Sequence, residues 1–192
     1  MSKKAVILHG TNGDPDNCWH PWLKKQLEAK GYEVFVPLLP DNDRPNKQTY
    51  DKFLRESGWD FENNLIVGHS SGATTVLNLL SEDWFPKVDT AILVGVFLNE
   101  KLTKSVDWYQ DGQFDELFVT KFDPEQLKTK VERFYFVHGD DDPYCDYEDA
   151  KMLCEQLNGN FISVKGGKHF TNSSGAFELP MLTERLLQDK VI

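Results

Sequence analysis

Short, continuously apolar runs alternate along this chain with segments of helical periodicity, and this alternation limits the possible folds most. Six such runs stand at residues 5–8, 32–36, 65–67, 91–96, 134–137 and 161–164. Strands that are apolar on both faces are typical of parallel sheets covered by helices on each side. The pattern therefore predicts one α/β domain over residues 1–192, with an open, mostly parallel sheet of about six strands.

The intervening segments carry apolar residues at helical spacing. Helices are expected at residues 19–30, 50–56, 71–81, 146–157 and 177–188. Residues 97–130 instead scatter aromatic side chains among polar ones, so irregular structure is expected there. The chain contains no internal repeat and no low-complexity linker that would mark a second domain.

Charge and cysteine content exclude several classes of function. The chain carries 21 Lys and Arg against 31 Asp and Glu, a formal net charge of -10, which disfavours binding to nucleic acid or to an anionic membrane. Its three cysteines, Cys18, Cys145 and Cys154, lack metal-binding spacing and fit a reducing compartment. No apolar run is long enough for a signal-peptide core or a membrane span. We therefore expect a soluble, cytoplasmic protein.

The sequence Gly68-His69-Ser70-Ser71-Gly72 lies between the third expected strand and the helix that follows it. A nucleophile on a sharp strand-to-helix turn needs small neighbours, because the turn is strained and tightly packed. The start of the helix also directs backbone N–H groups toward developing negative charge. We therefore predict that Ser70 is a nucleophile, and the alternative is a purely structural turn.

A serine hydroxyl needs a base to remove its proton, and His169 is the candidate among five histidines. It follows the last expected strand, in a loop with two glycines that can bring the imidazole over the carboxyl edge of the sheet. His9 and His69 flank the predicted nucleophile, and we expect them to pack or to shape loops. His20 stands at a helix start and His138 at a strand end.

The carboxylate that orients the base is expected in His138-Gly139-Asp140-Asp141-Asp142-Pro143, after the fifth strand. Asp142 is preferred because Pro143 would fix the turn that directs it. Asp140 and Asp141 are expected to be surface charges, with Asp141 as the alternative acid. Three aspartates in a row could instead bind a divalent cation. No further ligand cluster accompanies them, so no metal site is predicted.

Acyl transfer also requires two hydrogen-bond donors for the oxyanion. One is the backbone N–H of Ser71, and the other is expected after the first strand, with Thr11 preferred over Asn12. The glycine-rich loop around Thr11 raises an alternative, a phosphate- or nucleotide-binding α/β protein. The loop lacks both the dinucleotide-binding glycine spacing and the lysine of a P-loop, so this alternative is the weaker one.

Four motifs occur in order: Ile7-Leu8-His9-Gly10, the segment around Ser70, the segment ending at Pro143, and Gly166-Gly167-Lys168-His169-Phe170. Together with the length, they resemble the small lidless serine hydrolases of the α/β-hydrolase fold related to bacterial YdeN and to retinoblastoma-binding protein 9. The resemblance covers essentially the whole chain and implies a Ser70, His169 and Asp142 triad without a large cap domain.

The same resemblance implies hydrolysis of carboxylic esters or related small acyl compounds, with no cofactor. Members of this group are also discussed as binding proteins. The main alternative is therefore an interaction protein: a hydrolase scaffold that binds a protein partner and has little catalytic turnover.

Overall fold

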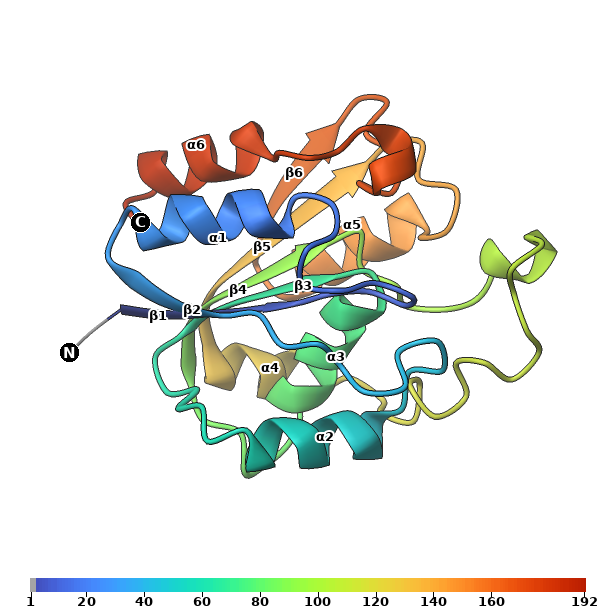
Figure 1. The fold of residues 1–192 in the computed structure, drawn as a ribbon, viewed down its shortest axis with the longest axis horizontal. Helices are drawn as coiled ribbons and strands as arrows, with labels where there is room; N and C mark the ends of the chain where they lie inside the picture. The colour runs from blue at the N-terminus through green and yellow to red at the C-terminus, as the bar shows by residue number, and fades with distance from the viewer. Residues whose placement is uncertain (1–2) are drawn as a thin grey trace.

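A six-stranded sheet organises residues 3–192, the part of the chain that this computed structural model describes (Figure 1). Its strands are β1 (Lys3–Leu8), β2 (Tyr32–Phe35), β3 (Leu65–His69), β4 (Val88–Val94), β5 (Val131–Gly139) and β6 (Asn160–Val164). They lie in the order β2-β1-β3-β4-β5-β6, and every neighbouring pair is parallel. The prediction of an open parallel sheet of about six strands is confirmed.

Helices cover both faces of this sheet. They are α1 (His20–Glu28), α2 (Lys47–Glu56), α3 (Ser71–Leu80), α4 (Pro124–Lys130), α5 (Tyr147–Gln156) and α6 (Pro180–Gln188). Helices α1 and α6 pack on one face, and α2 to α5 pack on the other (Figure 1). Within residues 3–192, no helix has the length and hydropathy needed to cross a bilayer.

The strands supply both core layers because successive side chains point to opposite faces. In β1, Val6 and Leu8 pack under α2 to α5, whereas Ala5 and Ile7 pack under α1 and α6. Helix α3 lies deepest, since every residue from Ser71 to Leu80 is buried. The turn that precedes α3 therefore leads into a helix that is enclosed by the core along its whole length.

Residues 97–130 depart from the expected irregular structure at their C-terminal end, where residues 124–130 form α4. Two local start signals explain this helix. The Asp123 side chain accepts a hydrogen bond from the Glu125 N–H, and Pro124 occupies the first helical position, where its missing N–H costs nothing. The prediction of irregular structure is therefore wrong for these seven residues.

The packing of α3 against the end of β1 leaves no room for a side chain at Gly72. A Cβ there would lie 2.4 Å from the carbonyl oxygen of Leu8 and 2.5 Å from that of His9. We expect Gly72→Ala to lower the free energy of unfolding by about 3 kcal/mol or more, because backbone atoms must move.

Gly175→Ala is the control for this substitution. A Cβ at Gly175 would meet nothing within 4 Å, so only its φ of +73° opposes alanine, at a cost of about 1–2 kcal/mol. Denaturant unfolding of the two variants measures the difference. Equal losses of stability would contradict the packing argument.

Candidate active site

Ser70 occupies the turn between β3 and α3 with a strained backbone, at φ 56° and ψ -123°. Such a conformation costs of order 1–3 kcal/mol and persists only where the surroundings enforce it. Here the Ser70 N–H donates to the Val94 carbonyl at 2.9 Å, and the Ser70 carbonyl accepts from the Ala73 N–H at 2.9 Å. The turn also needs glycine at position 68, because a Cβ there would lie 2.4 Å from the Gly72 carbonyl oxygen. The partly exposed serine is thus held at the carboxyl edge of the sheet.

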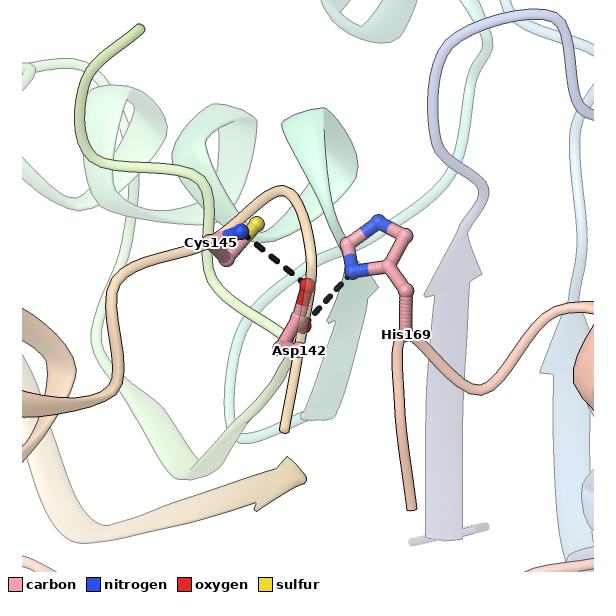
Figure 2. Close-up of side chains that lie close together, drawn as sticks. All are labelled: Asp142, Cys145 and His169. Carbon is pink, nitrogen blue, oxygen red and sulfur yellow. Dashed lines mark hydrogen bonds and ion pairs between the residues drawn. The ribbon is translucent and has the colours of Figure 1, made fainter. Parts of the chain in front are cut away.

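Asp142 and His169 contact each other directly, although they are 27 positions apart in the sequence (Figure 2). His169 Nδ1 donates to Asp142 Oδ2 at 2.7 Å, and both residues are buried. The other carboxylate oxygen, Oδ1, accepts from the N–H groups of Tyr144 at 2.9 Å and Cys145 at 3.0 Å. These bonds fix the carboxylate, and they place the imidazole proton on Nδ1, so that Nε2 carries a lone pair.

The two preceding aspartates hold the backbone of residues 165–170, the loop that contains His169 and is called the histidine loop below. Asp140 Oδ1 accepts from the Gly166 N–H at 2.8 Å, and Asp141 Oδ1 accepts from the Lys168 N–H at 2.8 Å. Both side chains are exposed, as expected. The sequence analysis treated them as surface charges and did not predict these contacts. No local pattern reveals them, because they join loops that follow different strands. Of the three aspartates, Asp142 is the one that contacts the imidazole.

His69 supports His169 from the core side. The His169 carbonyl accepts a hydrogen bond from His69 Nε2 at 2.8 Å. Burial lowers the pKa of His69 well below its ordinary value, so the ring stays neutral. The Tyr144 ring lies against the His169 ring in a T-shaped contact with centroids 5.1 Å apart. His169 is therefore held by Asp142 at its ring, by His69 at its backbone carbonyl, and by the T-shaped contact of its ring with Tyr144.

The loop after β1 brings Thr11 beside the start of α3. Thr11 Oγ1 donates to Ser71 Oγ at 2.9 Å. Within residues 3–192, the backbone N–H groups of Thr11 and Ser71 have no hydrogen-bond acceptor. The Asn12 N–H, in contrast, donates to the Asn42 carbonyl at 3.1 Å. Of the two donors that the sequence proposed in this loop, Thr11 is therefore the one whose N–H is available.

Two further buried histidines shape the same region. His9 Nδ1 donates to the Gly10 carbonyl at 2.8 Å, and His9 Nε2 accepts from the Leu39 N–H at 2.9 Å. This ring thus links the loop after β1 to the segment after β2. His20 Nδ1 donates to the Asp14 carbonyl at 3.3 Å, and burial lowers the pKa of His20 to about 4.

Ser70 and His169 line a cavity of about 220 Å³ with aromatic walls. Its walls include Phe97, Trp108 and Phe114, all from the segment that the sequence described as irregular. Phe97 and Phe114 meet edge to face with ring centroids 4.7 Å apart. The segment between β4 and α4 therefore supplies aromatic walls to the cavity that Ser70 lines.

A metal site could be considered at Asp142, Cys145 and His169, whose candidate ligand atoms lie within 4.8 Å of one another (Figure 2). Both carboxylate oxygens of Asp142 already accept hydrogen bonds. Burial raises the pKa of the Cys145 thiol well above its usual value, so the sulfur stays protonated. Metal ligation requires the thiolate. The cluster therefore fits a hydrogen-bonded His–Asp pair better than a cation site.

Residues 5–188 match the sequence model of the serine hydrolase family. The chain is 27% identical to YdeN of Bacillus subtilis (strain 168) over 187 residues, which cover 97% of this chain and 95% of YdeN. It is 21% identical to the serine hydrolase RBBP9 of Rattus norvegicus over 173 residues, or 88% of each chain.

Solved structures show the same architecture. The crystal structure of the B. subtilis ydeN gene product superposes with a TM-score of 0.85 at 24% identity, over 97% of this chain and 98% of that chain. The carboxylesterase CesB from the same species gives a TM-score of 0.63 at 14% identity, over 97% of this chain and 82% of that one. The α/β-hydrolase fold implied by the sequence resemblance is confirmed.

The buried, neutral His20 makes stability depend on pH. Its pKa is about 4 in the folded protein, against about 6.5 in an unfolded chain. As pH falls, the unfolded state therefore binds a proton first. The stability contributed by this ring is fully present above pH 6.5 and is lost as pH falls toward 4, by about 3 kcal/mol.

We expect the unfolding free energy of the wild type to fall more steeply between pH 7 and pH 4.5 than that of His20→Phe, which has no imidazole at this position. Urea unfolding at both pH values measures the two slopes. Carboxylates titrate equally in both proteins and cancel in the comparison. Identical slopes would contradict the buried neutral state of His20.

Proposed function

The chain belongs to the serine hydrolase family, and we propose that it cleaves esters of short carboxylic acids through an acyl-enzyme on Ser70. One observation carries the proposal: Ser70, His169 and Thr11 line the same cavity. Ser70 is a strained serine at a helix start, His169 belongs to a buried histidine–carboxylate pair, and Thr11 carries one of two backbone N–H groups without acceptors, the other being that of Ser71. Each is a separate requirement of acyl transfer.

In the proposed reaction, His169 Nε2 takes the proton of Ser70 as its oxygen attacks the ester carbonyl carbon. Asp142 stays ionised and stabilises the imidazolium through its bond to Nδ1. The N–H groups of Thr11 and Ser71 donate to the oxyanion, and the N-terminus of α3 adds its dipole. His169 then protonates the departing alcohol and later activates the water that releases the acid. These steps need no cofactor.

The aromatic cavity supports a short acyl chain as the group transferred to Ser70. Its volume of about 220 Å³ is below the roughly 300–1,000 Å³ of cavities that bury drug-sized ligands. Phe97, Trp108 and Phe114 among its walls favour contact with hydrocarbon. A butyryl group is apolar and fits within this volume.

The site favours hydrolysis over the two alternatives from the sequence. A binding scaffold gains nothing from a strained serine, whereas strain at a functional site is retained for its chemistry. A phosphate site would use cationic side chains, but no Lys or Arg lines the aromatic cavity at Ser70 within the described part of the chain. Three free thiols, Cys18, Cys145 and Cys154, support our proposal that this activity resides in the cytoplasm.

A fluorophosphonate probe tests the nucleophile. We expect the wild type to take up one probe per chain and Ser70→Ala to take up none, as read by intact mass spectrometry. Hydrolysis of p-nitrophenyl butyrate by Ser70→Ala should fall by roughly 10⁴-fold or more. Ser81→Ala, at the other end of α3, is the control and should label like the wild type. Equal labelling of Ser70→Ala would refute the assignment.

Replacing an aspartate by the isosteric asparagine tests which aspartate orients His169. We expect Asp142→Asn to lower kcat by roughly 10⁴-fold, because an amide no longer holds the required tautomer of His169. Asp141→Asn keeps an oxygen that can accept from the Lys168 N–H, so kcat should change by less than about tenfold. Steady-state kinetics on p-nitrophenyl butyrate compares the two. A large loss confined to Asp141→Asn would identify the other carboxylate as the acid.

A further inference from the structure

The segment 94–97, at the end of β4, holds Ser70 through two backbone hydrogen bonds. The Val94 carbonyl accepts from the Ser70 N–H at 2.9 Å, and the Phe97 N–H donates to the Ser70 carbonyl at 3.4 Å. The hydroxyl of Thr74 in α3 also donates to the Phe97 carbonyl. The backbone of this segment is therefore fixed against the turn that carries the serine.

Gly95 lies within this segment, against the bond between His169 and Asp142. A Cβ at position 95 would stand 3.1 Å from His169 Nδ1 and 3.3 Å from Asp142 Oδ2. These are the two atoms that the 2.7 Å hydrogen bond joins (Figure 2). Ordinary contacts of a Cβ are 3.4–4 Å long, so a side chain here would displace both atoms by a few tenths of an ångström. The pair therefore occupies space that exists because residue 95 has no side chain.

The atoms of the pair would have to yield, because the backbone of Gly95 is held in place. Its N–H donates to the Val137 carbonyl of β5 at 2.8 Å. Its neighbour Val94 accepts from the Ser70 N–H. A side chain at position 95 would therefore push on the imidazole and the carboxylate, while the backbone around Ser70 stays where it is.

A second property of Gly95 has to be separated from this contact. Its φ is +52°, a conformation that favours glycine at any position. Gly58, which follows α2, has a φ of +73°, but a Cβ there would meet nothing within 4 Å. Alanine at Gly58 thus adds backbone strain alone, whereas alanine at Gly95 adds strain and contact with the pair.

We propose that Gly95 is a positioning residue for the proposed reaction, because its missing side chain lets the His169–Asp142 pair close against the backbone segment that also holds Ser70. The inference rests on the proposed hydrolase function. Base and nucleophile are then placed relative to each other by one short stretch of backbone. Gly95 transfers no proton itself and acts through the pair.

Kinetics on p-nitrophenyl butyrate test the proposal. We expect Gly95→Ala to lower kcat by roughly 10- to 100-fold, because small misplacements of a catalytic group are costly. KM should stay within about twofold, since the change concerns proton transfer and not contact with the acyl chain. Gly58→Ala is the matched control and should keep the wild-type kcat.

Thermal unfolding of the same two variants measures the structural cost. Gly58→Ala should lower Tm by about 2–8 °C, the effect of left-handed strain in a chain of this size. Gly95→Ala should lie within about 4 °C of that control, because the atoms of the pair need to move by only a few tenths of an ångström.

Proton NMR gives a readout that backbone strain alone does not change. The Nδ1 proton of a histidine in a short bond to a carboxylate resonates downfield of the backbone amides, at a position that depends on the length of the bond. We expect this His169 resonance in the wild type and in Gly58→Ala. In Gly95→Ala it should move upfield or disappear.

A double-mutant cycle with Asp142→Asn tests whether Gly95 acts through the pair. When Asp142 is already replaced, adding Gly95→Ala should lower kcat by less than about threefold, because residues that act as a unit have non-additive effects. An equal fold loss in both backgrounds would overturn the inference.

Fluorophosphonate labelling separates failure of this inference from failure of the proposed function. If the wild type does not label at Ser70, the proposed function is wrong, and the role of Gly95 is wrong with it. If the wild type labels, a wild-type kcat or an unchanged His169 resonance in Gly95→Ala would overturn the inference alone. Failure of Gly95→Ala to fold would also overturn it, since glycine would then be required by the fold and not by the pair.

Discussion

The strained turn at Ser70 depends on backbone packing that tolerates no side chain. Gly68 and Gly72 allow the start of α3 to press against the ends of β1 and β3, with carbonyl oxygens where a Cβ would stand. Because α3 is buried along its whole length, the core adds to the two local hydrogen bonds of Ser70 in holding the strained backbone. The serine, the N–H of Ser71 and the helix dipole are therefore positioned together, as one rigid unit.

Close backbone packing at a glycine also positions the histidine loop, and hydrogen bonds hold it further. At Gly139 a Cβ would lie 2.3 Å from the Lys168 carbonyl oxygen, so the loop with the three aspartates and the loop with His169 meet backbone to backbone. Asp140, Asp141 and His69 then hold the loop, and Asp142 holds the ring. The other four histidines are buried, and burial lowers the pKa of each. Asp142 therefore faces His169 among neutral imidazoles.

The walls around Ser70 come from loops. The segment between β4 and α4 supplies aromatic rings, and the loops before α1 and after the histidine supply amides and hydroxyls. In the proposed enzyme, selectivity then resides in loops while the chemistry resides on the sheet edge, which is a common division of roles in α/β proteins.

The sequence by itself determined the six-strand parallel sheet, because apolar runs and helical periodicity are local patterns. It also placed Ser70, Asp142 and His169 after three different strands, and parallel strands bring their carboxyl ends to one edge. It missed α4, whose start signals at Asp123 and Pro124 were outweighed by scattered aromatics. Only the tertiary structure decided which aspartate reaches the imidazole, which N–H groups lack acceptors, and that His20 is buried as a neutral ring. Those features arise between loops far apart in the chain, where packing and burial, not local pattern, set the contacts.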